Sequence, residues 1–138
     1  AIRVANEFPQ VWATVGVHPH DASNATPETF PHLRELLKHP KVVGLGEMGL
    51  DYFYDHSPRD TQQSVFRQQI AIARETRTPI IIHTRDAWPD TFSILESEWA
   101  PAQLPGIMHC FSGGPAEAER CLNMGFYLSF AGVVTFPK

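Results

Sequence analysis

The chain has 138 residues, a net charge of -4 and 43% hydrophobic residues, which is the composition of one modest folded domain with a hydrophobic core. This charge argues against non-specific coating of nucleic acid, which needs a basic surface, but it allows a nucleic acid to be held locally by a metal. No apolar run reaches the roughly 18 residues that a membrane span needs. Cys110 and Cys121 lack paired spacing, which favours reduced thiols in a cytoplasmic protein over a disulfide.

The first predicted strand leads into a pair of histidines. The end of a helix is predicted over residues 1–8, before Pro9, and a β-branched strand over residues 11–17. The strand runs into His18 and His20. Two histidines separated by one residue can both bind a metal from extended chain. A substrate-binding or supporting role is an equal alternative, because a proline stands between them.

A carboxylate ends the second predicted strand. After a helix that begins at about Pro27, the segment KVVGLGE predicts a strand over residues 41–47, whose glycines suit a crowded interior or a close backbone approach. Glu47 ends the apolar run and must be paired, hydrogen-bonded or bound to a metal. The predicted loop beyond it contains Asp51 and the aromatic segment 52–54, whose rings could stack on a base or, as we favour, pack the loop down.

The strongest strand signal lies at residues 79–87, PIIIHTRDA, after a long helix predicted over residues 57–77. The continuous apolar run predicts a strand buried on both faces, and it ends abruptly at His83. For His83 alone, a histidine that caps a core strand is the alternative. The planar guanidinium of Arg85 suits a phosphate, and an ion pair with a neighbouring aspartate, Asp51 or Asp86, is equally compatible with the sequence.

The rest of the chain continues the alternation. A helix is predicted over residues 89–99, a short strand over 106–110 that runs into His109, a helix over 115–125 and a last strand over 126–130. Five strands alternating with four complete helices predict an α/β fold with a parallel sheet. An open doubly wound sheet and a closed TIM (β/α)8 barrel both have this pattern.

The polar strand ends favour the barrel. In an open sheet only a few strand ends reach the ligand crevice, whereas in a barrel every strand end lies on one rim. His18, Glu47, His83 and His109 end four successive strands, so we expect an incomplete barrel of about five β/α units, formed by residues 1–138 as a single domain. A carboxylate and two imidazoles on one rim would bind a divalent cation. Three ligands are too few for two metals, so further strands are expected on both sides.

Five motifs together resemble TatD-like metal-dependent deoxyribonucleases over essentially the whole chain. They occur in the family's order: GVHPHDA (16–22), GEMGLDY (46–52), PIIIHTRDA (79–87), HCFSG (109–113) and SFAGVVTF (129–136). The resemblance implies a metallo-dependent hydrolase of the TIM-barrel, amidohydrolase-like group. Such an enzyme cleaves DNA phosphodiester bonds in a 3'-5' exonuclease-like manner with two divalent cations, Mg2+ being favoured over Mn2+ and Zn2+.

The resemblance also assigns roles to residues. It implies that Glu47 is the catalytic residue and bridges two metals, and that His83 and His109 are ligands of one metal. It places His18, Asp51 and Arg85 close by, where we assign them to substrate binding. DNA is then the substrate of a cytoplasmic protein that is expected to be monomeric at full length.

Two family motifs are absent from the 138 residues. The first-strand His-x-His and the last-strand Glu-Thr-Asp would lie before Ala1 and after Lys138, and Ala131 stands where the family usually has serine. We therefore expect the 138 residues alone to be inactive. Two alternatives to a nuclease remain: an amide or ester hydrolase of the same barrel group, and an inactive piece that serves only as an interaction or structural unit.

Overall fold

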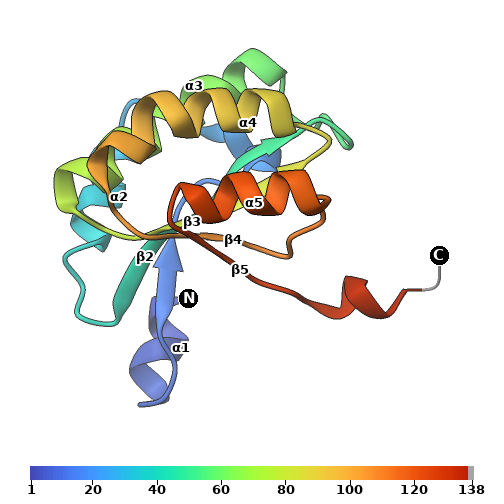
Figure 1. Cartoon of the computed structure of the whole chain (residues 1–138). Helices are drawn as coiled ribbons and strands as arrows, with labels where there is room; N and C mark the ends of the chain where they lie inside the picture. The colour runs from blue at the N-terminus through green and yellow to red at the C-terminus, as the bar shows by residue number, and fades with distance from the viewer. Residues whose placement is uncertain (137–138) are drawn as a thin grey trace.

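The chain forms a five-stranded parallel sheet with strand order β1-β2-β3-β4-β5, seen in a computed structural model that describes residues 1–136 (Figure 1). The strands are β1 (Ala13–Val15), β2 (Val42–Asp51), β3 (Ile80–Arg85), β4 (Gly106–Met108) and β5 (Phe126–Leu128). The α-helices are α1 (Ile2–Glu7), α2 (Thr29–Leu36), α3 (Arg59–Thr76), α4 (Trp88–Ile94) and α5 (Pro115–Asn123). Strands consecutive in sequence are neighbours in the sheet, which confirms the serial β/α arrangement.

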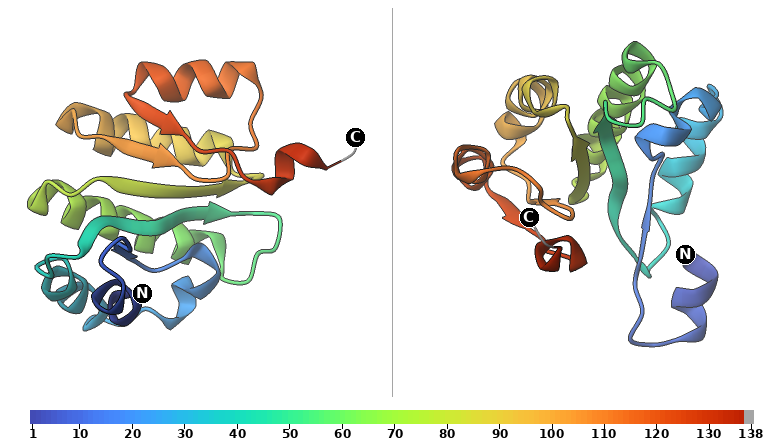
Figure 2. Two further views of the ribbon diagram at one scale, coloured as in Figure 1. Left: turned by 90° about the horizontal axis from the view of Figure 1, so that it is seen from below. Right: turned by 90° about the vertical axis from the view of Figure 1, so that its right-hand side faces the viewer.

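The sheet follows an arc, and helices α2 to α5 lie on its outer side (Figure 2). Side chains that point toward the helices are buried, as Ile80 and Ile82 show, whereas Ile107 and Tyr127 on the inner side are 37% and 69% exposed. The prediction that β3 is buried on both faces is wrong, because Ile81 between the two buried isoleucines is only half-buried. Five strands do not close around the concave face, so its side chains keep contact with solvent.

The core between sheet and helices is built by α3 and β2. Phe66, Ile70 and Ala73 repeat at helical spacing on α3 and are fully buried, as the sequence predicts. They pack in one cluster with Leu45 and Leu50 of β2. Each buried side chain of this size contributes roughly 1.5–3 kcal/mol, so this contact fixes the strand that carries Glu47.

Strand β2 continues past Glu47 to Asp51, whereas the sequence predicts a loop there. Gly46 and Gly49 have φ of 151° and 142°, and a Cβ at either position would collide with a backbone oxygen of β3. Their missing side chains let β2 remain paired with β3 as far as Asp51, opposite Arg85. Asp51 is therefore held by the sheet and is not part of a free loop.

The shorter elements differ from their predicted bounds. Strands β1, β4 and β5 have three residues each, and 3-10 helix η1 (Pro19–Asn24) follows β1. The last two turns of the α4 region are the π-helical η2 (Leu95–Trp99) and the 3-10 helix η3 (Ala100–Ala102). A short 3-10 helix, η4 (Gly132–Thr135), follows β5. Both cysteines are free thiols, as expected. Among the helices of residues 1–136, none is long and apolar enough to cross a membrane.

Candidate metal centre

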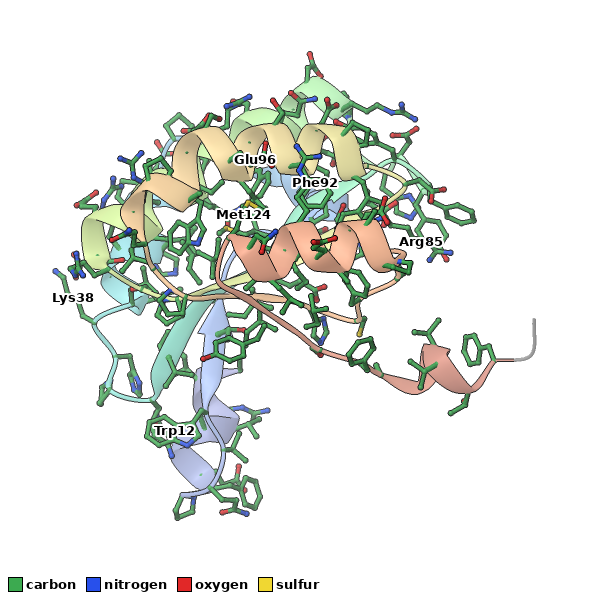
Figure 3. The ribbon with its side chains drawn as sticks, in the orientation of Figure 1. Trp12, Lys38, Arg85, Phe92, Glu96 and Met124 are labelled. Carbon is green, nitrogen blue, oxygen red and sulfur yellow. The ribbon has the colours of Figure 1, made fainter. Side chains whose placement is uncertain are left out.

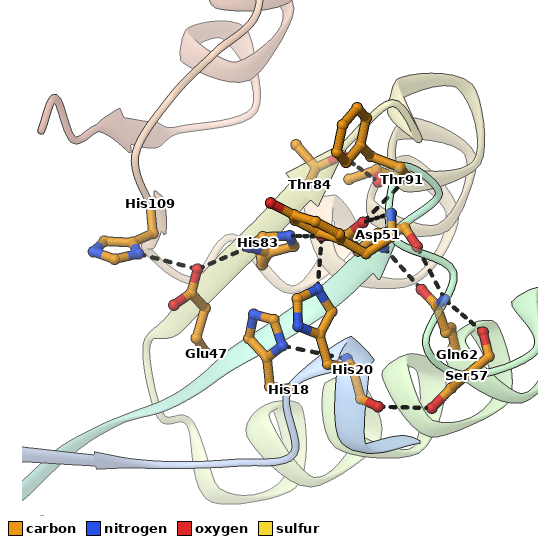
Figure 4. Close-up of polar contacts among 12 residues, drawn as sticks. His18, His20, Glu47, Asp51, Ser57, Gln62, His83, Thr84, Thr91 and His109 are labelled. Carbon is orange, nitrogen blue, oxygen red and sulfur yellow. Dashed lines mark hydrogen bonds and ion pairs between the residues drawn. The ribbon is translucent and has the colours of Figure 1, made fainter. Parts of the chain in front are cut away.

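Glu47, His83 and His109 converge at the carboxyl edge of the sheet (Figure 4). The Glu47 Oε1 atom lies 3.2 Å from His83 Nδ1 and 3.0 Å from His109 Nδ1. The three side chains come from β2, from β3 and from the residue just after β4. The structure thus brings together the three residues that the sequence predicts as metal ligands, although their role as ligands stays a prediction.

Backbone pairing that involves β3 sets the positions of His83 and His109. His83 pairs with Gly49 in the register of β2 and β3. The His109 N–H donates to the Ile82 carbonyl at 2.8 Å, which anchors the first residue after β4 to β3. His83 and His109 therefore both depend on β3, whereas Glu47 lies where the register of β2 and β3 shifts, between Leu45 and Met48.

Charge and hydrogen bonding keep Glu47 ionised. The hydrogen bond with His83 lowers the pKa of Glu47 to about 2, and His109 adds to this effect, so that together they outweigh the opposing influence of burial. Burial acts to lower the pKa of His83, but hydrogen bonds to Glu47 and Asp51 outweigh it and raise that pKa above its ordinary value. An anionic carboxylate between two imidazoles is a suitable environment for a cation.

His18 is a fourth donor next to this group. One ligand atom each of His18, Glu47 and His83 lie within 4.8 Å of one another, and the His18 and His83 rings meet edge to face at 4.6 Å. Burial lowers the pKa of His18, and repulsion from His83 and His20 lowers it further, which favours the neutral imidazole that metals bind. Its position fits a metal ligand as well as the substrate-binding role predicted from the sequence.

Asp51 forms a second carboxylate–histidine cluster four residues along β2. Its Oδ2 lies 2.9 Å from His20 Nε2 and 2.8 Å from His83 Nε2, and Oδ1 accepts the backbone N–H groups of Phe53 and Tyr54. Burial tends to raise the pKa of Asp51, but the Tyr54 N–H and the two imidazoles outweigh it and lower that pKa to about 2. Sequence reasoning missed that His20 belongs to this cluster, and the His-x-His spacing was its only signal.

Arg85 lies beside the aromatic loop after β2, at the edge of the molecule (Figure 3). Its guanidinium carbon is 4.0 Å from the Phe53 ring centroid and 4.8 Å from that of Tyr54. Within residues 1–136 it forms no ion pair, so the alternative of a salt bridge to an aspartate is wrong. Phe53 and Tyr54 are 55% and 49% exposed, and the favoured packing of the loop holds only for half-buried Tyr52, whose hydroxyl donates to Asp90.

The donors at the Glu47 cluster fit a divalent cation. Carboxylate oxygen and neutral imidazole nitrogen are ligands that Zn2+, Mn2+ and related ions accept. His18, Glu47 and His83, whose ligand atoms lie within 4.8 Å of one another, would hold such an ion. His109 approaches Glu47 Oε1 at the solvent-accessible rim, where its side chain is 43% exposed.

Solved structures share this fold. The chain superimposes on a crystal structure of YJJV, a TatD homolog from Escherichia coli K12, with TM-score 0.89 and 27% identity, covering 99% of this chain and 52% of that one. A TatD family hydrolase from Entamoeba histolytica gives TM-score 0.81 at 27% identity, covering 94% and 46%. The predicted fold, an incomplete TIM barrel of five β/α units, is confirmed.

Proteins of similar sequence indicate the same family as the solved structures. The chain is 51% identical over 138 residues to an uncharacterized metal-dependent hydrolase, YabD, of Bacillus subtilis, covering all of this chain and 54% of that protein. It is 38% identical over 135 residues to the 3'-5' ssDNA/RNA exonuclease TatD of Salmonella typhimurium, covering 97% and 51%. The chain spans about half the length of the curated relatives it matches. Because the family described as TatD related DNase matches all of residues 1–138, the chain belongs to that family.

Proposed function

We propose that this chain supplies the central part of a divalent-metal-dependent nuclease that cleaves single-stranded DNA as a 3'-5' exonuclease. The observation that carries the proposal is the single Glu47 oxygen shared by His83 and His109 at the carboxyl edge of the sheet. In this proposal Glu47 would be the catalytic residue and would bind both cations, Mg2+ being favoured. The free thiols of Cys110 and Cys121 support a cytoplasmic location, and we expect a monomer at full length.

The cations would supply the chemistry of phosphodiester hydrolysis. Divalent ions at such a site polarise a phosphoryl oxygen and lower the pKa of a water molecule. The chain's own part is to hold them with Glu47, His83 and His109, with His18 as a further donor beside them. Because the pKa of Glu47 is about 2, its carboxylate is anionic at neutral pH and is ready to bind them.

Arg85 and the two exposed rings support a single-stranded nucleic acid as substrate. The planar guanidinium suits a phosphate, and Phe53 and Tyr54, which are about half exposed beside it, are side chains of the kind on which unpaired bases stack. Bases inside a duplex are already stacked on each other and are not available for this contact. The Salmonella typhimurium relative, named a 3'-5' ssDNA/RNA exonuclease, supports the same substrate class.

The test compares nucleic acids with other hydrolase substrates. The full-length protein is incubated with Mg2+ and end-labelled single-stranded DNA, with a duplex of the same sequence, and with a panel of carboxyl esters and amides. We expect shortening of the single strand from its 3' end, and its abolition by EDTA. Hydrolysis confined to the ester and amide panel would overturn the proposal in favour of an acyl hydrolase on the same barrel.

A further inference from the structure

Each carboxylate oxygen of Asp51 has two hydrogen-bond partners, and the two pairs of partners are of different kinds. Oδ1 accepts the backbone N–H of Phe53 at 3.1 Å and of Tyr54 at 2.8 Å. Oδ2 lies 2.8 Å from His83 Nε2 and 2.9 Å from His20 Nε2. An ionised carboxylate only accepts hydrogen bonds, so both imidazoles must present an N–H to Oδ2. A doubly protonated His83 donates from Nε2 to Asp51 and from Nδ1 to Glu47. In a neutral His83, the shorter bond to the buried Asp51 carboxylate keeps the proton on Nε2, and Nδ1 carries the lone pair.

Asp51 itself is held rigidly. Its side chain is 1% exposed, and its backbone N–H donates to the Oε1 atom of buried Gln62 at 2.8 Å. The amide of Gln62 in turn donates to the Asp51 carbonyl at 3.0 Å and to the Ser57 carbonyl at 2.8 Å. Neither oxygen of Asp51 can turn away from its partners without leaving a buried polar group unpaired, which is unfavourable.

The other nitrogen of the same ring faces the Glu47 cluster. His83 Nδ1 lies 3.2 Å from Glu47 Oε1, on the side where the cation donors converge. We propose that Asp51 is a positioning residue that fixes the tautomer and orientation of His83, so that the Nδ1 lone pair is directed to the cation site beside Glu47. The consequence for catalysis rests on the proposed function, whereas the hydrogen-bonding claim does not. In metal proteins, removal of a group that orients a histidine ligand in this way typically costs about 10–100-fold in metal affinity or activity.

A second cation between His20, Asp51 and His83 is the competing interpretation, since one ligand atom from each lies within 4.8 Å of the others. Two observations favour hydrogen bonds. The separations of 2.8 and 2.9 Å from Oδ2 are hydrogen-bond lengths, and the Asp51 carboxylate is closed off from solvent. A cation there would also take the Nε2 atom of a ring whose Nδ1 already serves the Glu47 cluster. The experiment below distinguishes the two interpretations.

The decisive variant is Asp51→Asn, which keeps the shape of the side chain. The N–H groups of Phe53 and Tyr54 still need an acceptor, so the amide oxygen stays at the Oδ1 position and the NH2 group replaces Oδ2. That group donates where the carboxylate accepted, so Nε2 of His83 must become the acceptor and the proton moves to Nδ1. The Nδ1–H then points at Glu47, and cation binding loses a ligand.

The main readout is the tautomer of His83 in the metal-free, full-length protein, followed by 15N NMR of the imidazole nitrogens at a pH where the ring is neutral. We expect the Nε2–H form in the unmodified protein and the Nδ1–H form in Asp51→Asn. Titration with Mn2+ should show affinity lowered by about 10–100-fold. The matched control is Asp86→Asn, an exposed aspartate at the same edge of the sheet, which should change neither.

A second variant covers the case in which Asp51→Asn does not fold. In His20→Phe, Asp51 keeps its bond to His83, so we expect the same His83 tautomer and the same number of Mn2+ ions per chain. Loss of one ion in His20→Phe would overturn the proposal in favour of a second cation site. An Nδ1–H tautomer of His83 in the unmodified protein would overturn it as well. Absence of nuclease activity together with the expected tautomers would reject the proposed function and leave the positioning role of Asp51 standing.

Discussion

Glu47 and Asp51 lie four residues apart in β2, and each places one carboxylate oxygen between two imidazoles, yet their surroundings are opposite. The Glu47 side chain is 27% exposed, and within residues 1–136 its second oxygen has no hydrogen-bond partner. The Asp51 side chain is 1% exposed, and both of its oxygens are fully bonded. A carboxylate with unused acceptor capacity and access to solvent is suited to bind a cation, whereas a saturated, buried one is suited to hold its neighbours in place.

The two clusters are connected through His83, the only residue of the described chain that bonds to both carboxylates. One ring nitrogen belongs to each cluster, so the buried cluster can set what the exposed one offers to a cation. The comparison thus predicts different consequences for changes on the two sides. A change at Glu47 should remove cation binding directly, whereas a change around Asp51 should act indirectly, through the orientation of His83 or through the stability of the fold.

The largest effect is expected from Glu47→Gln. The amide keeps the shape of the carboxylate but removes the negative charge that faces two imidazoles and that would attract the proposed cations. We expect turnover on single-stranded DNA to fall by on the order of 10²-fold or more, with a matching loss of metal binding and little change in folding. Calorimetric titration with Mn2+ and the cleavage assay measure this. Glu119→Gln, which alters an exposed glutamate on α5, is the control, and normal cleavage by Glu47→Gln would reject the bridging role.

On the other side of the comparison, Gln62→Leu should act on stability. Leucine fills a similar volume but leaves the N–H and carbonyl of Asp51 and the carbonyl of Ser57 without their partner. We expect the free energy of unfolding to fall by roughly 3 kcal/mol. Urea unfolding of the metal-free protein measures it, beside Gln68→Leu on the exposed side of the same helix. Equal stability of the two variants would show that the buried cluster does not need its support.

The stability of the chain and its metal affinity should depend on pH in opposite directions, because both depend on the protonation of His83. The pKa of His83 is raised in the folded chain, so the stability that it contributes is complete below its unfolded value of 6.5 and is lost as the pH rises through the folded value. Without metal, the free energy of unfolding should therefore fall as the pH rises above 6.5. Metal affinity should rise over the same range, because a neutral ring binds the cation. Urea unfolding with and without Mg2+ tests this, and parallel curves would contradict it.

The exposed cluster was predictable from the sequence, and the buried one was not. Glu47, His83 and His109 each end an apolar run, and parallel strands bring such ends to one edge whatever the details of the fold. The extension of β2 to Asp51 depends on Gly46 and Gly49, whose effect is visible only when β3 lies against them. The run of apolar residues in β2 gives no information about how closely β3 approaches, so the sequence predicts a loop at Asp51.

The contact of His20 with Asp51 was hidden for a similar reason. It depends on the 3-10 turn η1, in which the His20 N–H donates to His18 Nδ1 and the ring turns toward β2. The extended segment that the His-x-His spacing suggested would have directed both histidines alike. The exposure of Phe53 and Tyr54 also depends on where β2 ends. A correct end for this strand would therefore have corrected two predictions, the loop position of Asp51 and the packing of the aromatic segment.

The smallest effect is expected from Arg85→Lys, which lies outside both clusters. Lysine keeps the charge but loses the planar guanidinium that lies over Phe53 and that would contact a phosphate of the proposed substrate through two N–H groups. We expect KM for single-stranded DNA to rise roughly fivefold, about 1 kcal/mol, with kcat and Mn2+ affinity unchanged. Arg74→Lys on α3 is the control. A fall in kcat with constant KM would place Arg85 in the catalytic cluster, and the division of this edge into cation binding, support and substrate contact would then have to be redrawn.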